Sequence, residues 1–299
     1  DHWFYRRERT YAYRGRHDDL GAWLESFLVV HRIDALVLFG QHRPVHEVAR
    51  AVAARLGLPV FVFEEGYLRP DYITLEEGGV NGLSSVPRRA EQLRFLPSAP
   101  PAARPEPTDQ RFMHMAWYAT CYSIAMCLGW PAFPHHVYHR PLHPVSQALA
   151  WVRGGLRKLW HGWTQRGLAA RLAAPGRQQR YFLLPLQVHN DSQMLRHSPY
   201  PDVEAVIDDV MASFARHADP QDWLVIKHHP MDRAYRCYAR HIAHRTAQLR
   251  LQDRVLYVHD LHLPTLLRHA RGVVTVNSTT GLQALYHKVP VITLGECFY

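Results

Sequence analysis

The sequence contains only four cysteines among its 299 residues, and no two of them form a CxxC pair. Their spacing fits neither a zinc site nor a disulfide framework, and isolated thiols of this kind are typical of a reducing compartment. The sequence opens without a signal peptide, and no apolar run reaches the roughly 18 residues that a membrane span needs. These absences predict a cytoplasmic location.

Several chemical signatures are also missing. Without a Walker A sequence or a GxGxxG motif, nucleoside triphosphate hydrolysis and dinucleotide redox chemistry lose support. A DxD-like acidic pair, which a metal-dependent sugar transferase would show, is not found, so neither a metal nor a cofactor is expected. No zinc finger, RNP-like motif or compact basic run supports specific binding to nucleic acid.

Composition describes a folded, basic protein. Hydrophobic residues make up 47 % and charged residues 20 % of the chain, so a sizeable core is expected in one large or two medium domains. The formal net charge is +9 and the isoelectric point is near 9.6. The partner is therefore expected to be acidic: nucleic acid, an anionic membrane surface or an anionic small substrate.

The first hundred residues contain a strand–helix–strand pattern. A helix is predicted over residues 18–31, a buried strand over 34–40, a helix opened by Pro44 and stopped by Gly57, and a second buried strand over 58–66. Short connections between such elements imply parallel strands.

The second half repeats the alternation. A Pro- and Ala-rich linker at residues 98–109 and a basic, aromatic stretch at 110–180 separate the two halves. Five strands and four intervening helices then predict a doubly wound α/β domain. The strands are expected at 181–187, 223–229, 254–258, 272–276 and 290–294, and the helices at 202–217, 235–249, 263–270 and 279–287.

Together these patterns predict an α/β protein of GT-B architecture, with two Rossmann-like domains whose parallel sheets face an interdomain cleft. We expect an N-terminal domain over residues 1–100, a linker and helical basic segment over 101–178, and a C-terminal nucleotide-sugar-binding domain over 179–299. Ligands of open parallel sheets bind beyond the carboxyl ends of the strands, so the polar residues that follow the strands are the candidates for a site.

Two of these strand ends carry carboxylates. Glu64 and Glu65 precede Gly66; burial and a like-charged neighbour would raise the pKa of one of them, which suits a general acid or base. A solvated turn is the alternative explanation of the pair. Asp191 lies between amide and hydroxyl side chains of Gln187 and Gln193 and their neighbours, as a nucleophile held in one orientation would. An Asx turn or a helix cap is the alternative for Asp191.

Two further strand ends carry groups that bind anions. One is the run Lys227, His228, His229 and Pro230, in which a cation and an imidazole can grip a phosphate, although a strand-ending turn with a surface lysine explains it too. The other strand end has Ser and Thr side chains between a strand and a helix. N-capping of the helix explains these residues fully, but the free N–H groups of the helix start can also bind an anion. Its candidate residues are Asn277, Ser278 and Thr279.

Four segments in this order resemble the KpsS/LipB family of capsule β-Kdo transferases: EEGYLRPDYITLE (64–76), LQVHNDSQ (186–193), KHHP (227–230) and VNSTTGLQALYHKVPVITLG (276–295). The resemblance implies retaining transfer of Kdo from CMP-β-Kdo by double displacement. It implies that Asp191 is the nucleophile, with Gln187 and Gln193 orienting it or the sugar. Of the acidic pair, Glu64 is favoured over Glu65 as the acid/base.

The resemblance also assigns the donor site and the acceptor. His229 and Pro230 match the HP motif that contacts CMP, and Ser278 and Thr279 match the Ser/Thr pair near the donor phosphate or carboxylate. The implied acceptor is phosphatidylglycerol or its lyso form at the inner face of the cytoplasmic membrane, with capsule assembly or export proteins as possible partners. Family members extend beyond both ends of this chain, so a fragment whose N-terminal domain lacks its first strand is expected.

Three alternatives stay open. The first is a GT-B transferase that uses another nucleotide sugar, and the second is a capsule-assembly protein that has lost its chemistry. The third is a protein whose positive charge serves to bind nucleic acid. Separately, the basic, Trp-rich segment 151–166 is predicted either to lie on an anionic membrane or to pack as an inter-domain helix with a solvated basic face.

Overall fold

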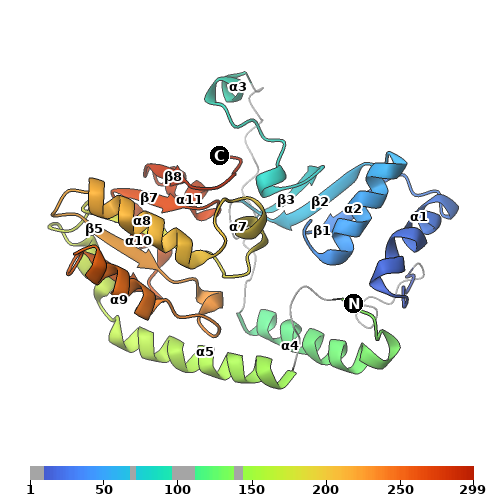
Figure 1. The fold of residues 1–299 in the computed structure, drawn as a ribbon, viewed down its shortest axis with the longest axis horizontal. Helices are drawn as coiled ribbons and strands as arrows, with labels where there is room; N and C mark the ends of the chain where they lie inside the picture. Colours follow the sequence, from blue (N-terminus) through green and yellow to red (C-terminus); the bar gives the residue numbers. More distant parts are fainter. Residues whose placement is uncertain (1–9, 68–71, 96–111, 138–143) are drawn as a thin grey trace. The chain divides into compact units, whose positions relative to one another are not determined.

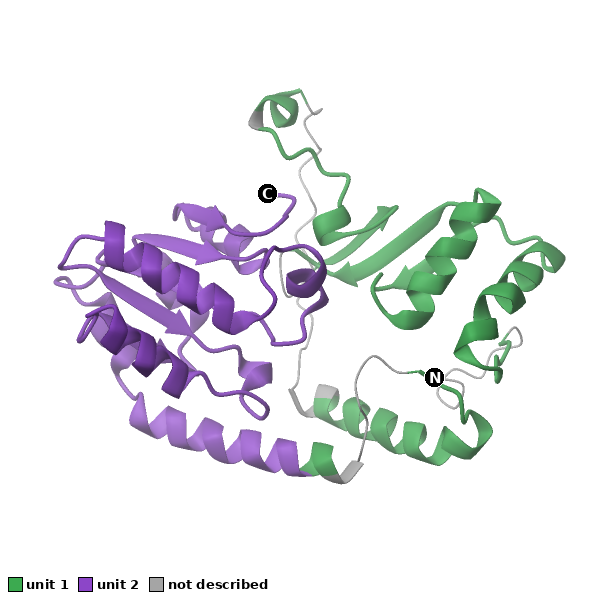
Figure 2. Ribbon diagram, in the orientation of Figure 1, with its two compact units in different colours: residues 1–148 green, residues 149–299 purple. Residues whose placement is uncertain are grey.

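A computed structural model describes residues 10–67, 72–95, 112–137 and 144–299. The chain divides into two compact units, residues 1–148 and 149–299 (Figure 2). The predicted middle segment 101–178 contributes α4 to unit 1 and most of α5, with α6, to unit 2. The predicted linker at 98–109 lies outside the described residues.

Unit 2 is built on five parallel strands in the order β6-β5-β4-β7-β8, so β4, the first strand of the unit in the chain, is the central one (Figure 1). The crossovers are helical, as parallel strands require. The strands are β4 (Tyr181–Pro185), β5 (Trp223–Lys227), β6 (Val255–Val258), β7 (Gly272–Thr275) and β8 (Val291–Thr293). The helices are α6 (Leu168–Ala173), α7 (Ser192–Arg196), α8 (Val203–His217), α9 (Ala239–Gln248), α10 (Leu263–His269) and α11 (Thr280–Tyr286), with the 3-10 turn η4 (Pro230–Asp232).

This sheet separates two hydrophobic cores. Side chains of successive strand residues point to opposite faces, so Leu184 and Ile226 enter one core while Leu183 and Val225 enter the other. The first core is closed by α8 and α9, and the second by α6, α10 and α11. The doubly wound α/β arrangement predicted for the C-terminal half is confirmed.

Unit 1 contains a smaller, mixed sheet. Strand β1 (Leu36–Phe39) pairs in parallel with β2 (Val60–Glu65), as predicted, and β2 pairs antiparallel with β3 (Ile73–Glu77). Strand β3 was not recognised in the sequence. Before and between these strands lie η1 (His17–Asp19), α1 (Leu20–Val30) and α2 (Pro44–Leu56), and after them come η2 (Asn81–Leu83) and α3 (Ala90–Arg94).

Local sequence explains the ends of α2 and of β2. Pro44 occupies the first turn of α2, and Gly57 ends the helix in the left-handed conformation with φ 68°. At the end of β2 the N–H of Gly66 donates to the carbonyl oxygen of Tyr72 over 2.9 Å. A Cβ on Gly66 would lie 2.1 Å from that oxygen, so the close approach of β3 requires glycine.

Two long helices join the sheets. They are α4 (Phe112–Gly129) and α5 (Pro144–Thr164), with the turn η3 (Trp130–Ala132) between them. Within the described part of the chain, no helix combines the length and the apolar character needed to cross a membrane. Helix α5 includes most of the segment for which the sequence left membrane contact and packing as alternatives.

Candidate functional site

Three of the four predicted strand ends meet at one edge of the unit 2 sheet. Strand β4 lies between β5 and β7, and all three are parallel, so the loops that follow them leave the sheet on the same side. These loops carry Asp191, His229 and Asn277 with their neighbours. The fourth predicted strand end, with Glu64 and Glu65, belongs to unit 1.

Both carboxylate oxygens of Asp191 accept hydrogen bonds. The side chain of Gln187 donates to Oδ2 over 3.1 Å, and the backbone N–H of Gln193 donates to Oδ1 over 2.9 Å. The second bond makes Asp191 the N-cap of α7, so the capping alternative is realised. The same two bonds fix the carboxylate in one orientation, which is the property that a nucleophile needs.

Asn277 ties the β7 loop to the β4 loop. Its Oδ1 accepts from Gln187 over 3.0 Å and its N–H donates to Gln187 Oε1 over 3.2 Å. Its Nδ2 donates to the carbonyl oxygens of Gln193 and His197 over 2.9 and 3.2 Å. Gln187 and Asn277 are both buried, so this pair of amides fixes the side chain of Gln187, which donates to Asp191.

A His–Asp pair that the sequence analysis missed lies beside this network. Asp232 is fully buried, and its carboxylate accepts from the backbone N–H of His189 over 2.8 Å and contacts His189 Nδ1 at 2.5 Å. His189 is 27 % exposed in its side chain. The contact of Nδ1 with a buried carboxylate fixes the orientation of the ring and leaves Nε2 as the ring nitrogen that can meet another group. The signal that could have found the pair is the acidic residue two positions after Pro230.

The lysine–histidine run at the end of β5 divides into buried and accessible parts. Lys227 and His228 are buried, and burial lowers the pKa of both; that of His228 falls to about 4. His228 Nδ1 also lies 2.6 Å from the hydroxyl of Tyr257, so its ring is packed within the unit. His229 and Pro230 are more accessible. The N–H of Met231 donates to His229 Nδ1 over 3.2 Å, which places the proton of a neutral ring on Nε2.

The Ser/Thr loop after β7 is used for capping. Ser278 Oγ accepts from the N–H of Thr280 over 3.2 Å, at the start of the seven-residue helix α11. The side chain of Thr279 makes no capping bond. The predicted anion-binding role of Ser278 and Thr279 stays a prediction.

In unit 1 the two glutamates differ in exposure. Glu64 is half-buried and Glu65 is exposed, as alternation along β2 predicts. Glu64 Oε2 lies 3.8 Å from the position of a Cβ built on Gly40, so its carboxylate reaches toward the loop that follows β1. Among the described residues, no three His, Cys, Asp or Glu side chains are grouped to hold a metal ion; a metal-free site stays a prediction.

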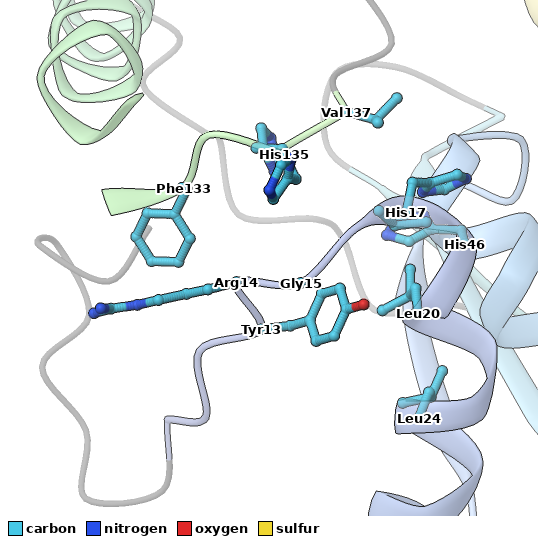
Figure 3. A pocket seen from close by; sticks show the side chains of 12 residues that line it. Tyr13, Arg14, Gly15, His17, Leu20, Leu24, His46, Phe133, His135 and Val137 are labelled. Atoms are coloured by element: carbon cyan, nitrogen blue, oxygen red, sulfur yellow. The ribbon is translucent and has the colours of Figure 1, made fainter. Parts of the chain in front are cut away.

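A separate pocket of about 210 Å³ opens in unit 1 (Figure 3). Its walls come from the segment before α1, from α1 and α2, and from the loop that follows η3. It contains none of the predicted site residues. The polar lining is aromatic and basic: Tyr13, Arg14, His17, His46, His135 and His136.

Comparison with known proteins identifies relatives along the whole chain. The chain is 42 % identical over 304 residues to the capsule polysaccharide export protein KpsS of Escherichia coli, covering 99 % of this chain and 76 % of that protein. It is 38 % identical over 307 residues to the capsule polysaccharide modification protein LipB of Neisseria meningitidis serogroup A, covering 100 % and 73 %. The resemblance to KpsS and LipB predicted from the sequence is confirmed.

Among solved structures, the chain is similar to the β-Kdo 2,7-transferase KpsC of Thermosulfurimonas dismutans. The identity is 16 % and the TM-score 0.46, over 92 % of this chain and 69 % of that one. Residues 34–299, which include every predicted site residue, match the family described as capsule polysaccharide biosynthesis protein. The chain therefore belongs to the capsule polysaccharide biosynthesis protein family.

Proposed function

We propose that this protein is a retaining β-Kdo glycosyltransferase that moves Kdo from CMP-β-Kdo to phosphatidylglycerol or its lyso form. Membership in a capsule polysaccharide biosynthesis family supports a role in making a capsule glycoconjugate. The observation that carries the proposal is the carboxylate of Asp191, which lies beyond the central strand β4 with both oxygens held by hydrogen bonds.

The chemistry assigned to Asp191 is a double displacement. One carboxylate oxygen attacks the anomeric carbon of the donor, the bond from that carbon to the phosphate oxygen breaks, and the electron pair leaves with CMP. The acceptor hydroxyl then attacks the same carbon, its proton passes to a general base, and the carboxylate of Asp191 departs. Each step inverts the configuration, so the product retains that of the donor.

Groups at the neighbouring strand ends are assigned to the donor. We assign His229 Nε2–H, with Pro230 after it, to donate to the phosphate of CMP, and we assign Ser278 and Thr279, which follow β7 on the other side of β4, to the donor as well. We add His189, oriented by Asp232: with Nδ1–H donated to that carboxylate, the doubly protonated ring can donate from Nε2 to the departing phosphate. Lys227 and His228 are buried, so we assign them to supporting the loop behind His229.

The general acid/base is assigned to unit 1. Glu64 is the better candidate because it is partly withdrawn from water, whereas Glu65 is exposed. This assignment rests on the GT-B architecture expected from the sequence. We place the reaction at the inner face of the cytoplasmic membrane, where the lipid acceptor lies and where capsule assembly and export proteins would take over the product.

Mass spectrometry provides the direct test. The protein is incubated with CMP-Kdo and a short-chain lysophosphatidylglycerol, and the lipid fraction is analysed for a mass increase of one Kdo. Digestion of the quenched protein should place a Kdo adduct on the peptide that contains Asp191. A Kdo-lipid product without any adduct on that peptide in the pre-steady state would refute the nucleophile.

The donor is tested by thermal unfolding. CMP should raise the melting temperature, because a ligand that binds the native state stabilises it by mass action, and UDP at the same concentration should not. Protection by UDP alone would favour another nucleotide sugar. No protection by either nucleotide, together with no product, would favour a non-catalytic assembly protein.

A further inference from the structure

Helix α5 packs on unit 2 through its polar side. Arg153 donates to the backbone carbonyl of Ala234, and Arg157 Nη1 donates to the carbonyl oxygen of Arg233 over 2.7 Å. Gly154 lies so close to the same loop that an added Cβ would be 3.4 Å from the side chain of Ala234. The side chains of Arg153 and Arg157 therefore face unit 2 on this stretch of the helix.

The second half of the helix continues the same contact. The ring of His161 stacks on that of His259 with centroids 3.5 Å apart and planes 5° apart. Gln165, just beyond the helix end, accepts from the N–H of His259 over 2.9 Å. The contacts at 153, 157, 161 and 165 recur every four residues, so they lie on one side of the helix and fix its rotation.

The outward side of α5 is apolar. Its large hydrophobic side chains recur at helical spacing and cover an arc of about 100° at 3.6 residues per turn. We call these residues the apolar stripe: Leu149, Val152, Leu156, Leu159, Trp160 and Trp163. Leu156 is 64 % exposed, Leu159 is 73 % exposed and Trp163 is 66 % exposed. A surface helix of a soluble domain turns this side to the core, so α5 is oriented the opposite way.

The charge of the chain is concentrated around this helix. Residues 110–190 contain nine Lys and Arg and no Asp or Glu, so the other 218 residues hold 26 basic and 26 acidic side chains. The whole formal charge of +9 thus belongs to this segment. In unit 2 its exposed cations include Lys158, Arg166 and Arg171.

We propose that the apolar stripe of α5 docks into the headgroup region of an anionic phospholipid bilayer. Tryptophan and leucine on the outer side of a helix insert at this depth, and flanking cations attract anionic headgroups. Figure 1 shows α5 along the margin of its unit, as docking requires. A second copy of the chain is disfavoured as the occupant, because it would bring together two segments without carboxylates. Docking goes beyond the proposed transfer reaction, since it needs no donor sugar.

Vesicle binding by the full chain tests this surface. Wild type should sediment with vesicles of phosphatidylcholine containing 30 % phosphatidylglycerol, and far less with phosphatidylcholine alone. Leu156→Glu combined with Trp160→Ser should weaken the partition coefficient by at least about tenfold. The matched control is Leu285→Glu combined with Tyr286→Ser, two exposed apolar residues on α11, which should bind as wild type does.

Two double charge-reversal variants distinguish docking through α5 from the general attraction of a basic protein to anionic lipid. Lys158→Glu with Arg166→Glu should reduce binding to the anionic vesicles clearly more than Arg216→Glu with Arg268→Glu. Both pairs replace two exposed cations and change the net charge equally, but the second pair lies on α8 and α10. Equal losses would overturn the assignment to α5.

Wild-type protein gives a readout that does not depend on a variant folding. Lipids brominated near the headgroup should quench tryptophan fluorescence, and Trp160→Phe with Trp163→Phe should remove most of that quenching. Absent quenching would overturn the proposal, and so would unchanged vesicle binding of the stripe variant. A soluble dimer that Leu156→Glu dissociates would make a second copy the occupant. Because these assays contain no donor, their failure leaves transfer to a short-chain soluble acceptor untouched.

Discussion

Each unit has a buried glutamine two residues after its first strand, but the two glutamines have different roles. Gln41 follows β1 by two residues and Gln187 follows β4 by two residues, and each is buried. Gln41 accepts from the N–H of Val80 over 2.8 Å and donates to its carbonyl oxygen over 2.9 Å. Gln187 likewise accepts from the N–H of Asn277, but it donates to the side-chain Oδ1 of Asn277 and to the carboxylate of Asp191.

We call each buried glutamine, with the hydrogen bonds of its amide, a clamp. The clamp of Gln41 in unit 1 joins two loops, whereas the clamp of Gln187 in unit 2 also holds the carboxylate assigned to the reaction. A buried amide that closes on backbone satisfies that backbone and joins two loops. An amide that also donates to a carboxylate fixes the direction of a charge. We therefore expect chemistry to be more sensitive to the unit 2 clamp than stability alone would explain, and the following predictions test that expectation.

Asp191→Asn should have the largest effect. An amide oxygen is a poor nucleophile, while the substitution preserves size and much of the capping, so we expect transfer to fall by at least about 1,000-fold. Rates of Kdo transfer at saturating donor measure the change. CMP binding should persist, because the group removed is not assigned to the nucleotide.

The matched control is Asp202→Asn. Asp202 is also a helix N-cap, accepting from the N–H of Ala205 over 2.8 Å at the start of α8. It should lose about as much capping energy as Asp191→Asn and keep its activity. If the two variants lost activity equally, Asp191 would be only a cap.

The two glutamates of unit 1 provide the next largest contrast. Glu64→Gln should lower transfer by about 100-fold or more, the usual contribution of a general acid/base, whereas Glu65→Gln should stay near wild type. The rate against pH should lose one limb in Glu64→Gln only. A larger loss in Glu65→Gln would reverse the assignment of the acid/base.

How far the sequence predicts this fold depends on how local each signal is. The apolar runs that became β4, β5 and β7 were recognised because burial on both faces leaves nearly continuous hydrophobic sequence. Strand β3 was missed because ITLEE is short and ends in two adjacent glutamates, its apolar residues Ile73 and Leu75 are exposed, and its place depends on the approach of Tyr72 to Gly66. Helix α9 begins at Ala239 rather than near 235, because the N–H groups of Tyr235 and Arg236 bond to Asp232 in a turn.

The site shows the same limit. Asp191, His229 and Asn277 were found because each follows a recognisable strand. The partners Asp232 and Gln41 were not found, because their bonds cross 43 and 39 residues of sequence; the only local signal for Asp232 is its place two positions after Pro230. The roles of the found residues still await the predictions made for them.

The clamps themselves give a third comparison. Gln41→Ala and Gln187→Ala should each lower the free energy of unfolding by about 1–3 kcal/mol, because each leaves buried polar groups without a partner. Only Gln187→Ala should reduce kcat more than the loss of folded protein accounts for. Urea unfolding and initial rates on the same samples measure both. Equal activity losses would mean that the unit 1 clamp also serves the reaction.

The smallest expected effect concerns pH. Burial, with His161 and His228 nearby, lowers the pKa of His259 to about 3, and burial lowers that of His46 in unit 1 despite its bond to the carbonyl of Gly40. A neutral buried histidine takes up its proton only on unfolding, so its contribution to stability is present above about pH 6.5 and is lost as pH falls toward the folded pKa.

The slope is at most about 1.4 kcal/mol per pH unit for each such group. Between pH 6.5 and 5, His259→Gln should therefore flatten the dependence of unfolding free energy on pH, and His46→Gln should flatten it less. The exposed His262→Gln should leave it unchanged. Since His259 also anchors α5 through His161, an unaltered slope in His259→Gln would mean that this contact opens to water without unfolding the unit.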